Sequence, residues 1–548
     1  MLPLDAFASD RMGFVLWGVC WLSVSAGWVV GSMWVVRDAR LVFGRATPWK
    51  QLLALAGVAI FLGTVFIGRA ALPSLLVVLP LVLAVSYFLA RDKASPRSLQ
   101  WLPWHVLKPL EERLINELGL REWLDRSRLT AEDNRRRATA LKSIVLVRHD
   151  GVACHERDPA LDKREARTVL AVKRLLWKAT DAGATAILFE PPAQPGGRGT
   201  LRCQVAGALE PLPLPKTLDV AGIAAVVKSL VGLDPAPANQ PRYGNFQLIS
   251  GGHKIEMQAA FGPMSNGEKI MLRAFDPDGL PNIGQLGMSE PMVRKVRDIV
   301  LGRQGMLLVA GPPSAGKTTT AFSVLESIDR LKTVIVTIED RLQYQLDNVL
   351  QTTVDKTPEG TVAKRLEALL RQDPAKILFG EIREPQTAEI ALRAAASGRL
   401  VITTRRAADA AAAIADLLQC GCDPAVLQGG LTAVLAQRLI RLLCPICRKP
   451  RPADAEAMRP LGLPVGTVEL LYEPQGCEHC LNGFRGCTAL YELLVVDPKL
   501  RAALVTRPAV DQIRALSAAA GNGSLWHAAL ARVVAGQTSV AEARRVVS

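Results

Sequence analysis

Residues 311–318 spell GPPSAGKT and fit the phosphate-binding pattern of Gly, four residues of any kind, then Gly-Lys-Ser/Thr. An apolar run at residues 306–310 comes before the segment, and a stretch of helical composition follows at residues 319–325. In a strand–loop–helix unit, the loop N–H groups and the helix N-terminus both face a bound phosphate. A glycine-rich turn that matches by accident is the alternative, and the flanking strand and helix weigh against it. The segment therefore predicts a nucleotide-binding domain whose first strand is buried in a parallel sheet.

The side chains of this segment have separate predicted roles. Lys317 is expected to reach the outer phosphates of the nucleotide, and the Thr318 hydroxyl to join the ligands of Mg²⁺. The predicted nucleotide-binding residues are Gly311, Ser314, Ala315, Gly316, Lys317, Thr318 and Thr319.

Two glutamates stand at the ends of further predicted strands. Glu339 follows the apolar residues 334–338, and Glu381 ends the strand predicted over residues 376–381. Strands that alternate with helices predict an α/β fold, and the carboxyl ends of parallel strands meet at one edge of the sheet. Phosphoryl transfer to water needs one acid that holds magnesium and one that orients or deprotonates the attacking water. We expect Glu381 on the metal side and Glu339 on the water side; the alternative is that both acids only cap neighbouring helices.

Four of the ten cysteines form two C-x-x-C pairs, separated by residues 448–476. Each pair can place two thiolates on one metal from a tight turn, and two pairs complete a tetrahedron suited to structural zinc. The predicted ligands are Cys444, Cys447, Cys477 and Cys480, with His479 as a substitute ligand and Cys487 as a packing residue. Four incidental buried cysteines are the alternative. Ten cysteines in 548 residues indicate a metal site in a reducing compartment rather than a disulfide framework.

The first 93 residues predict membrane insertion. Uncharged or nearly uncharged runs cover residues 14–36, 52–68 and 75–90. Basic residues gather at 37–50 and 91–97, which predicts three transmembrane helices with the rest of the chain in the cytoplasm. One span followed by a buried helical hairpin is the alternative. The net charge of +15 suits anionic lipid heads or nucleotides, and no basic stripe predicts a nucleic-acid partner.

These patterns divide the chain into six parts. We expect transmembrane helices at 1–93, a charged helical connector at 94–164, an α+β domain at 165–283, and the nucleotide-binding domain at 284–440. A tetracysteine zinc subdomain at 441–490 and a helical region at 491–548 complete the predicted organisation.

The motifs together resemble the secretion ATPases of type II secretion and type IV pilus assembly. The resemblance rests on residues 311–320, 337–340, 370–383, 436–439 and 486–492, and on the cysteine pairs. It implies a RecA-like P-loop ATPase domain that uses ATP and Mg²⁺, preceded by a smaller α+β domain that reaches over the neighbouring subunit's nucleotide. It also implies a homo-hexameric ring acting on pilin-like subunits with an inner-membrane platform protein, at the bacterial cytoplasmic membrane. Arg273 matches an arginine of the family's smaller domain and becomes a third catalytic candidate.

The chain departs from the family at several positions. Gln258 stands where the family usually has arginine, and Arg399 and Arg406 replace the two histidines of the family's histidine box. We expect Arg399 and Arg406 at the active edge of the sheet, where one of them could supply the charge missing at Gln258; the alternative is that both point into solvent. Three functions remain open: a working motor ATPase, a slowly hydrolysing nucleotide-binding scaffold, and a membrane-anchored docking protein in which nucleotide sets ring shape.

Overall fold

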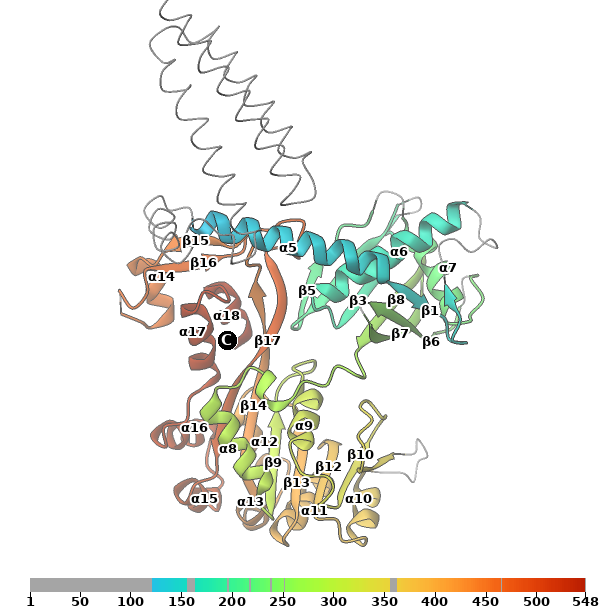
Figure 1. The fold of residues 1–548 in the computed structure, drawn as a ribbon. Coiled ribbons are helices and arrows are strands. Elements are labelled where there is room, and N and C mark those ends of the chain that lie inside the picture. The colour runs from blue at the N-terminus through green and yellow to red at the C-terminus, as the bar shows by residue number, and fades with distance from the viewer. Residues whose placement is uncertain are drawn as a thin grey trace, which may run out of the picture. The chain divides into compact units, whose positions relative to one another are not determined.

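The computed structural model describes residues 121–154, 163–194, 197–215, 218–236, 239–250, 252–354, 362–464 and 466–547 (Figure 1). The chain divides into two compact units, Met1–Leu124 and Asp125–Ser548. The predicted spans at residues 14–36, 52–68 and 75–90 lie outside the described residues. Among the residues that are described, no helix is both long and apolar enough to cross a membrane.

The smaller domain contains an eight-stranded sheet with the order β2-β1-β6-β7-β8-β3-β4-β5, in which neighbouring strands are all antiparallel. The strands are β1 (Val145–Val147), β2 (Ala153–Cys154), β3 (Ala186–Glu190), β4 (Thr200–Val205), β5 (Ala208–Pro211), β6 (Arg242–Ser250), β7 (His253–Met264) and β8 (Gly267–Phe275). β1 and β2 lie before residue 165, where the sequence pattern places the start of this domain. Strands of two and three residues show no readable alternation, so the pattern does not reveal them.

Two helices supply the apolar cover of this sheet. α6 (Lys163–Asp181) and α7 (Val220–Leu230) contribute Leu176 and Ile223 to the same buried core as Phe189 of β3. β7 and β8 form a hairpin that turns through Asn266 and Gly267, with Gly267 at φ 136°. In the segment expected to be a charged connector, α5 (Arg121–Ser143) forms a helix of 23 residues.

The nucleotide-binding domain is built on a seven-stranded sheet with the order β11-β10-β12-β13-β9-β14-β17. Its strands are β9 (Gly305–Ala310), β10 (Ile335–Glu339), β11 (Leu350–Thr353), β12 (Lys376–Glu381), β13 (Leu400–Arg405), β14 (Leu431–Leu443) and β17 (Phe484–Val495). Every neighbouring pair is parallel except β14 and β17, which are antiparallel. The predicted parallel sheet is confirmed, and the α/β class of this domain with it.

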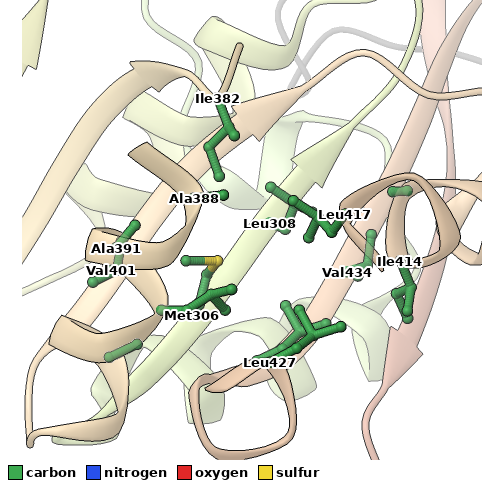
Figure 2. Packing of buried hydrophobic residues seen from close by; sticks show 14 of the residues in the cluster. Met306, Leu308, Ile382, Ala388, Ala391, Val401, Ile414, Leu417, Leu427 and Val434 are labelled. Atoms are coloured by element: carbon green, nitrogen blue, oxygen red, sulfur yellow. The ribbon is translucent and has the colours of Figure 1, made fainter. Parts of the chain in front are cut away.

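Both faces of this sheet are buried, and β9 shows why. Met306 and Leu308 belong to one core, whereas Leu307 and Val309 alternate with them and belong to the other. The first core includes side chains of α10 (Val362–Leu370), α11 (Pro385–Ala396), α12 (Ala410–Gln419) and α13 (Pro424–Gly430). Figure 2 shows Met306 and Leu308 among side chains of α11, α12 and α13. The second core includes side chains of α8 (Glu290–Leu301) and α9 (Lys317–Glu326).

The C-terminal part follows β17 as a series of helices. They are α15 (Pro498–Leu504), α16 (Val510–Ala519), α17 (Leu525–Val534) and α18 (Val540–Val547). α17 and α18 form a further core with Ile440 of β14 and Leu490 of β17. A two-stranded ribbon, β15 (Lys449–Pro452) and β16 (Leu470–Glu473), lies in the chain between the two cysteine pairs.

Candidate nucleotide-binding site

The backbone of the phosphate-binding loop explains its glycines. The loop connects the end of β9 to the start of α9, and Gly316 adopts φ 83° in the left-handed region that favours glycine. Ser314 also has a positive φ, 59°. A Cβ built on Gly311 would lie 2.5 Å from the main-chain oxygen of Gln437, so only glycine fits between the loop and β14. The curled loop and its close approach to β14 therefore depend on Gly311 and Gly316.

Lys317 lies against the start of the loop. Its Nζ donates hydrogen bonds to the main-chain oxygens of Gly311 and Pro312, both at 2.9 Å. Burial is the largest cause of a lowered pKa at Lys317; the charge of Glu381 opposes this lowering and the charge of Arg406 adds to it. The ammonium group is thus held by carbonyl oxygens that phosphate oxygens can replace.

A cavity of about 530 Å³ opens beside the loop, within the usual size range of ligand pockets. Six of the predicted nucleotide-binding residues line it: Ser314, Ala315, Gly316, Lys317, Thr318 and Thr319. Its other walls include residues at the end of β8, in the chain that follows β8, and on β14 and β17: Phe275, Pro281, Gln285, Leu286, Gln437, Leu439, Cys487, Thr488 and Tyr491. A nucleotide with its phosphates at the loop would have this cavity for the rest of the molecule.

Glu339 ends β10 and is buried, with an exposed fraction of 5%. Its Oε1 accepts hydrogen bonds from Thr337 Oγ1 at 2.9 Å and Gln351 Nε2 at 3.0 Å, and its Oε2 accepts one from Gln343 N at 3.3 Å. Burial raises the pKa of Glu339, and these three hydrogen bonds only partly offset that effect. A carboxylate with a raised pKa is a better proton acceptor near neutral pH.

Glu381 ends β12 and lies between two arginines. Its Oε1 is 2.9 Å from Arg406 Nε, and its Oε2 is 3.1 Å from Arg383 Nε. Burial pushes the pKa of Glu381 upward, but the hydrogen bonds from Arg383 and Arg406 outweigh it and hold the pKa below its usual range. Arg383 also binds Asp340, at 3.0 Å, and so links the ends of β10 and β12. Glu381 is therefore a charged carboxylate whose neutralising partners are already in place.

Arg399 does not lie at the active edge of the sheet, and the expectation that placed it there is wrong. It comes directly before the first residue of β13, so it stands at the edge opposite the phosphate-binding loop. Its NH2 is 2.7 Å from Asp373 Oδ1, and its carbonyl accepts a hydrogen bond from Gly305 N at the start of β9. Arg406 follows the last residue of the same strand and does lie at the active edge. Of the two arginines, only Arg406 is placed to act on the nucleotide.

Arg273 and Gln258 are directly opposite each other on β8 and β7. Arg273 is exposed, and neither residue is among those that line the cavity beside the loop. The catalytic role of Arg273 stays a prediction.

Three further side chains that contact the loop region were not assigned roles from the sequence. Gln437 of β14 donates from Nε2 to the main-chain oxygen of Ala315, at 2.5 Å. The hydroxyls of Tyr344 and Tyr491 share hydrogen bonds with Thr319, at 3.3 Å, and Thr320, at 3.2 Å. Gln437 and Tyr491 lie in segments that carry the family resemblance, which was the available signal. Their contacts depend on the pairing of β9, β14 and β17, which the local sequence does not reveal.

The four predicted zinc ligands come together as one group. Their Sγ atoms all lie within 4.8 Å of one another, including 3.9 Å for Cys444–Cys477, 3.7 Å for Cys447–Cys480 and 3.6 Å for Cys477–Cys480. A tetrahedral zinc site with Zn–S bonds of about 2.3 Å needs S–S separations of about 3.8 Å. The donor set and its spacing therefore fit a structural zinc ion.

His479 has a different role from the substitute ligand that the sequence suggests. It is buried, and its Nδ1 lies 2.6 Å from Asp133 Oδ2 of α5. Asp133 is also 2.6 Å from Arg485 NH1 and 3.0 Å from Arg137 Nε. His479 thus helps to join the second cysteine pair to α5.

A parallel sheet covered on both faces, a left-handed glycine turn with Lys317, and glutamates at two strand ends define a P-loop nucleotide-binding protein. Residues 162–545 match the family described as "Type II/IV secretion system protein". The chain therefore belongs to this family of secretion ATPases.

The relatives agree with this assignment, and one solved structure is similar in fold. The chain is 36% identical over 306 residues to "Type II secretion system protein E" of Klebsiella pneumoniae, a match that covers 56% of this chain and 61% of the relative. It is 35% identical over 384 residues to the protein of the same name from Pseudomonas aeruginosa, covering 70% of this chain and 76% of the relative. The X-ray structure of the Legionella pneumophila ATPase DotB is similar in fold, with a TM-score of 0.51 and 15% identity over 71% of this chain and 97% of that one.

Proposed function

We propose that this chain hydrolyses ATP to drive the assembly of pilin-like or pseudopilin-like subunits in a type II secretion or type IV pilus machinery. The observation that carries the proposal is the placement of Lys317, Glu339 and Glu381 at one edge of a parallel sheet, where Lys317 lines a cavity of about 530 Å³. Lys317 supplies positive charge for an anionic ligand, and ligands of open α/β sheets bind at the carboxyl ends of the strands, where the two glutamates lie.

The chain's own residues divide the work of hydrolysis. Lys317 leaves the carbonyls of Gly311 and Pro312 and binds the outer phosphates of ATP. Glu339, buried and with a raised pKa, orients the attacking water and accepts its proton while the bond to ADP breaks and inorganic phosphate forms. The Thr318 hydroxyl and the Glu381 carboxylate are oxygen donors of the kind that Mg²⁺ prefers and would hold that ion. Bound Mg²⁺ would supply positive charge against the phosphates.

The proposed assembly is a homo-hexameric ring tethered to the bacterial inner membrane by helices within residues 1–93, with the ATPase domain in the cytoplasm. An inner-membrane platform protein is the proposed partner. Arg273 is exposed and does not line the cavity of its own chain, which supports a role toward the nucleotide of a neighbouring copy. One zinc ion on the cysteine group is proposed to hold the turn before β17.

A slowly hydrolysing scaffold is the second candidate, because Gln258 leaves Arg273 without a second arginine opposite it on β7. Phosphate release by the purified full-length chain, compared with Lys317→Ala, separates the two functions. A motor shows multiple turnovers that Lys317→Ala abolishes, whereas a scaffold binds ATP in wild type and releases little phosphate. Binding of neither ATP nor ADP by the wild-type chain would reject both.

Two further measurements test the assembly. Mass photometry reports ring formation directly. Cysteines introduced at residues 45 and 72 test the tether, since labelling from outside the membrane should reach only residue 72 if three spans are present. Labelling of residue 72 only after permeabilisation would favour the single-span alternative.

A further inference from the structure

The two arginines on Glu381 are not equivalent. Arg383 binds two carboxylates, Glu381 and Asp340, whereas Arg406 pairs with Glu381, its Nε lying 2.9 Å from Glu381 Oε1. The side chain of Arg406 is 65% exposed and that of Glu381 only 14% exposed. The guanidinium of Arg406 is therefore exposed to solvent, whereas the carboxylate that it binds is largely buried.

The backbone places Arg406 beside the phosphate-binding loop. Arg405 is paired with Ala310 across β13 and β9, and its carbonyl accepts a hydrogen bond from Gly311 N at 3.2 Å. Arg406 is the next residue, so it borders the first residue of the loop. The charges of Arg406 and Glu381 both act on the pKa of Lys317, which places the three groups in one electrostatic neighbourhood.

The structure assigns to Arg406 the recognition of the terminal phosphate: it exchanges its partner Glu381 for the outermost phosphate of a nucleoside triphosphate. This inference rests on the proposed function. A diphosphate has its phosphates at the loop and Lys317 but offers nothing to Arg406, so the residue distinguishes the triphosphate from the diphosphate.

The exchange is physically favourable because the two bonds of Arg406 differ in strength. An ion pair with an exposed guanidinium contributes little to stability and is readily given up. A guanidinium fork binds phosphate with two parallel charge-assisted hydrogen bonds, and the terminal phosphate carries more charge than a carboxylate. The exchange also leaves Glu381 with one arginine instead of two, which frees one of its oxygens.

Titration calorimetry of the full-length chain with ADP and with a non-hydrolysable ATP analogue tests the inference by binding rather than by turnover. Arg406→Gln should weaken analogue binding by about tenfold or more, the size expected for one charged hydrogen bond, with ADP binding changed far less. Arg406→Lys should fall between, since it keeps the charge and loses the fork. Arg399→Gln is the matched control at the opposite end of β13 and should bind both ligands like wild type.

Equal losses for both ligands in Arg406→Gln, or no loss for either, would overturn the inference. The proposed function would stay in place as long as the wild-type chain hydrolyses ATP and Lys317→Ala does not. Should Arg406→Gln fail to fold, as judged by thermal unfolding, Arg406→Lys alone decides, because unchanged discrimination in that variant also overturns it. A wild-type chain that binds neither ligand would remove the proposed function and the inference together.

Discussion

The side-chain nitrogen of Gln437 lies 2.5 Å from the main-chain oxygen of Ala315, so β14 holds the phosphate-binding loop by a buried hydrogen bond. Gln437→Leu leaves that oxygen buried without its donor, and we expect a loss of about 1–3 kcal/mol in the free energy of unfolding. Nucleotide binding should weaken with it, because the loop loses a fixed point. Thermal unfolding and ADP titration measure the two effects, and Gln386→Leu on the exposed surface of α11 is the control. A variant with wild-type stability and affinity would show that the loop holds its shape without β14.

The raised pKa of Glu339 predicts a pH dependence of hydrolysis. A base must be deprotonated, so the rate should fall as the pH drops. In the pH–rate profile, the midpoint of this fall should lie above the pKa of an ordinary glutamate. Glu339→Gln should lower the rate by about 10²–10⁴-fold with nucleotide binding retained. The pH–rate profile of wild type and variant tests this, with Glu389→Gln on α11 as a control. An acid limb that persists in Glu339→Gln would assign it to another group.

The cysteine group predicts one zinc ion per chain. Elemental analysis of the purified chain should find it, and Cys444→Ser combined with Cys477→Ser should remove it. Because ligand binding and local folding are coupled at such sites, the double variant should also unfold at a lower temperature. Cys487→Ser, which lies outside the group, should keep its zinc. If the purified wild-type protein contains no zinc, the alternative holds, namely four buried cysteines that only pack together.

Glu542 of α18 predicts acid sensitivity of the C-terminal part. Burial raises its pKa, but hydrogen bonds from Arg545 and Arg441 outweigh burial and leave the pKa lowered. A lowered folded-state pKa stabilises the protein above the unfolded-state value, near 4.3, and this stabilisation is lost as the pH falls through the folded-state pKa.

Arg441→Met removes one partner and leaves Glu542 buried, so we expect a loss of about 3–5 kcal/mol at pH 7. Urea unfolding at pH 7 and below pH 4 measures it, and the difference from wild type should shrink in acid. A difference that does not change with pH would rule out Glu542 as its source.

Local patterns predicted the parts of the site that one segment can encode. The loop around Lys317 combines strand, glycine turn and helix within a few residues, and Glu339 and Glu381 end apolar strands that were readable in the sequence. β14 was not readable, because Gln437 and Arg441 interrupt its apolar pattern and their buried partners come from distant segments.

The placement of Arg399 shows the limit of such reasoning. Arg399 and Arg406 bracket one six-residue strand of a parallel sheet, so only the residue after the strand lies at the carboxyl-end edge. The match of both arginines to the family's two histidines did not show which of them lies there. The partners of these side chains could not be predicted from the sequence either, because the ion pair of Arg406 with Glu381 joins the ends of two separate strands.

β17 joins two sites that are far apart in space but continuous in the chain. It begins at Phe484, four residues after Cys480, and carries Tyr491, whose hydroxyl bonds Thr320 of α9. The eight residues from Phe484 to Tyr491 span about 23 Å of extended backbone and are paired with β14 over most of that length. A paired strand cannot slide by a fraction of a residue without breaking its ladder. From Cys487 to Tyr491 the pairing with β14 runs without a register shift. A displacement of the cysteine turn is therefore either absorbed before Cys487 or costs hydrogen bonds of the ladder that positions Tyr491 against α9.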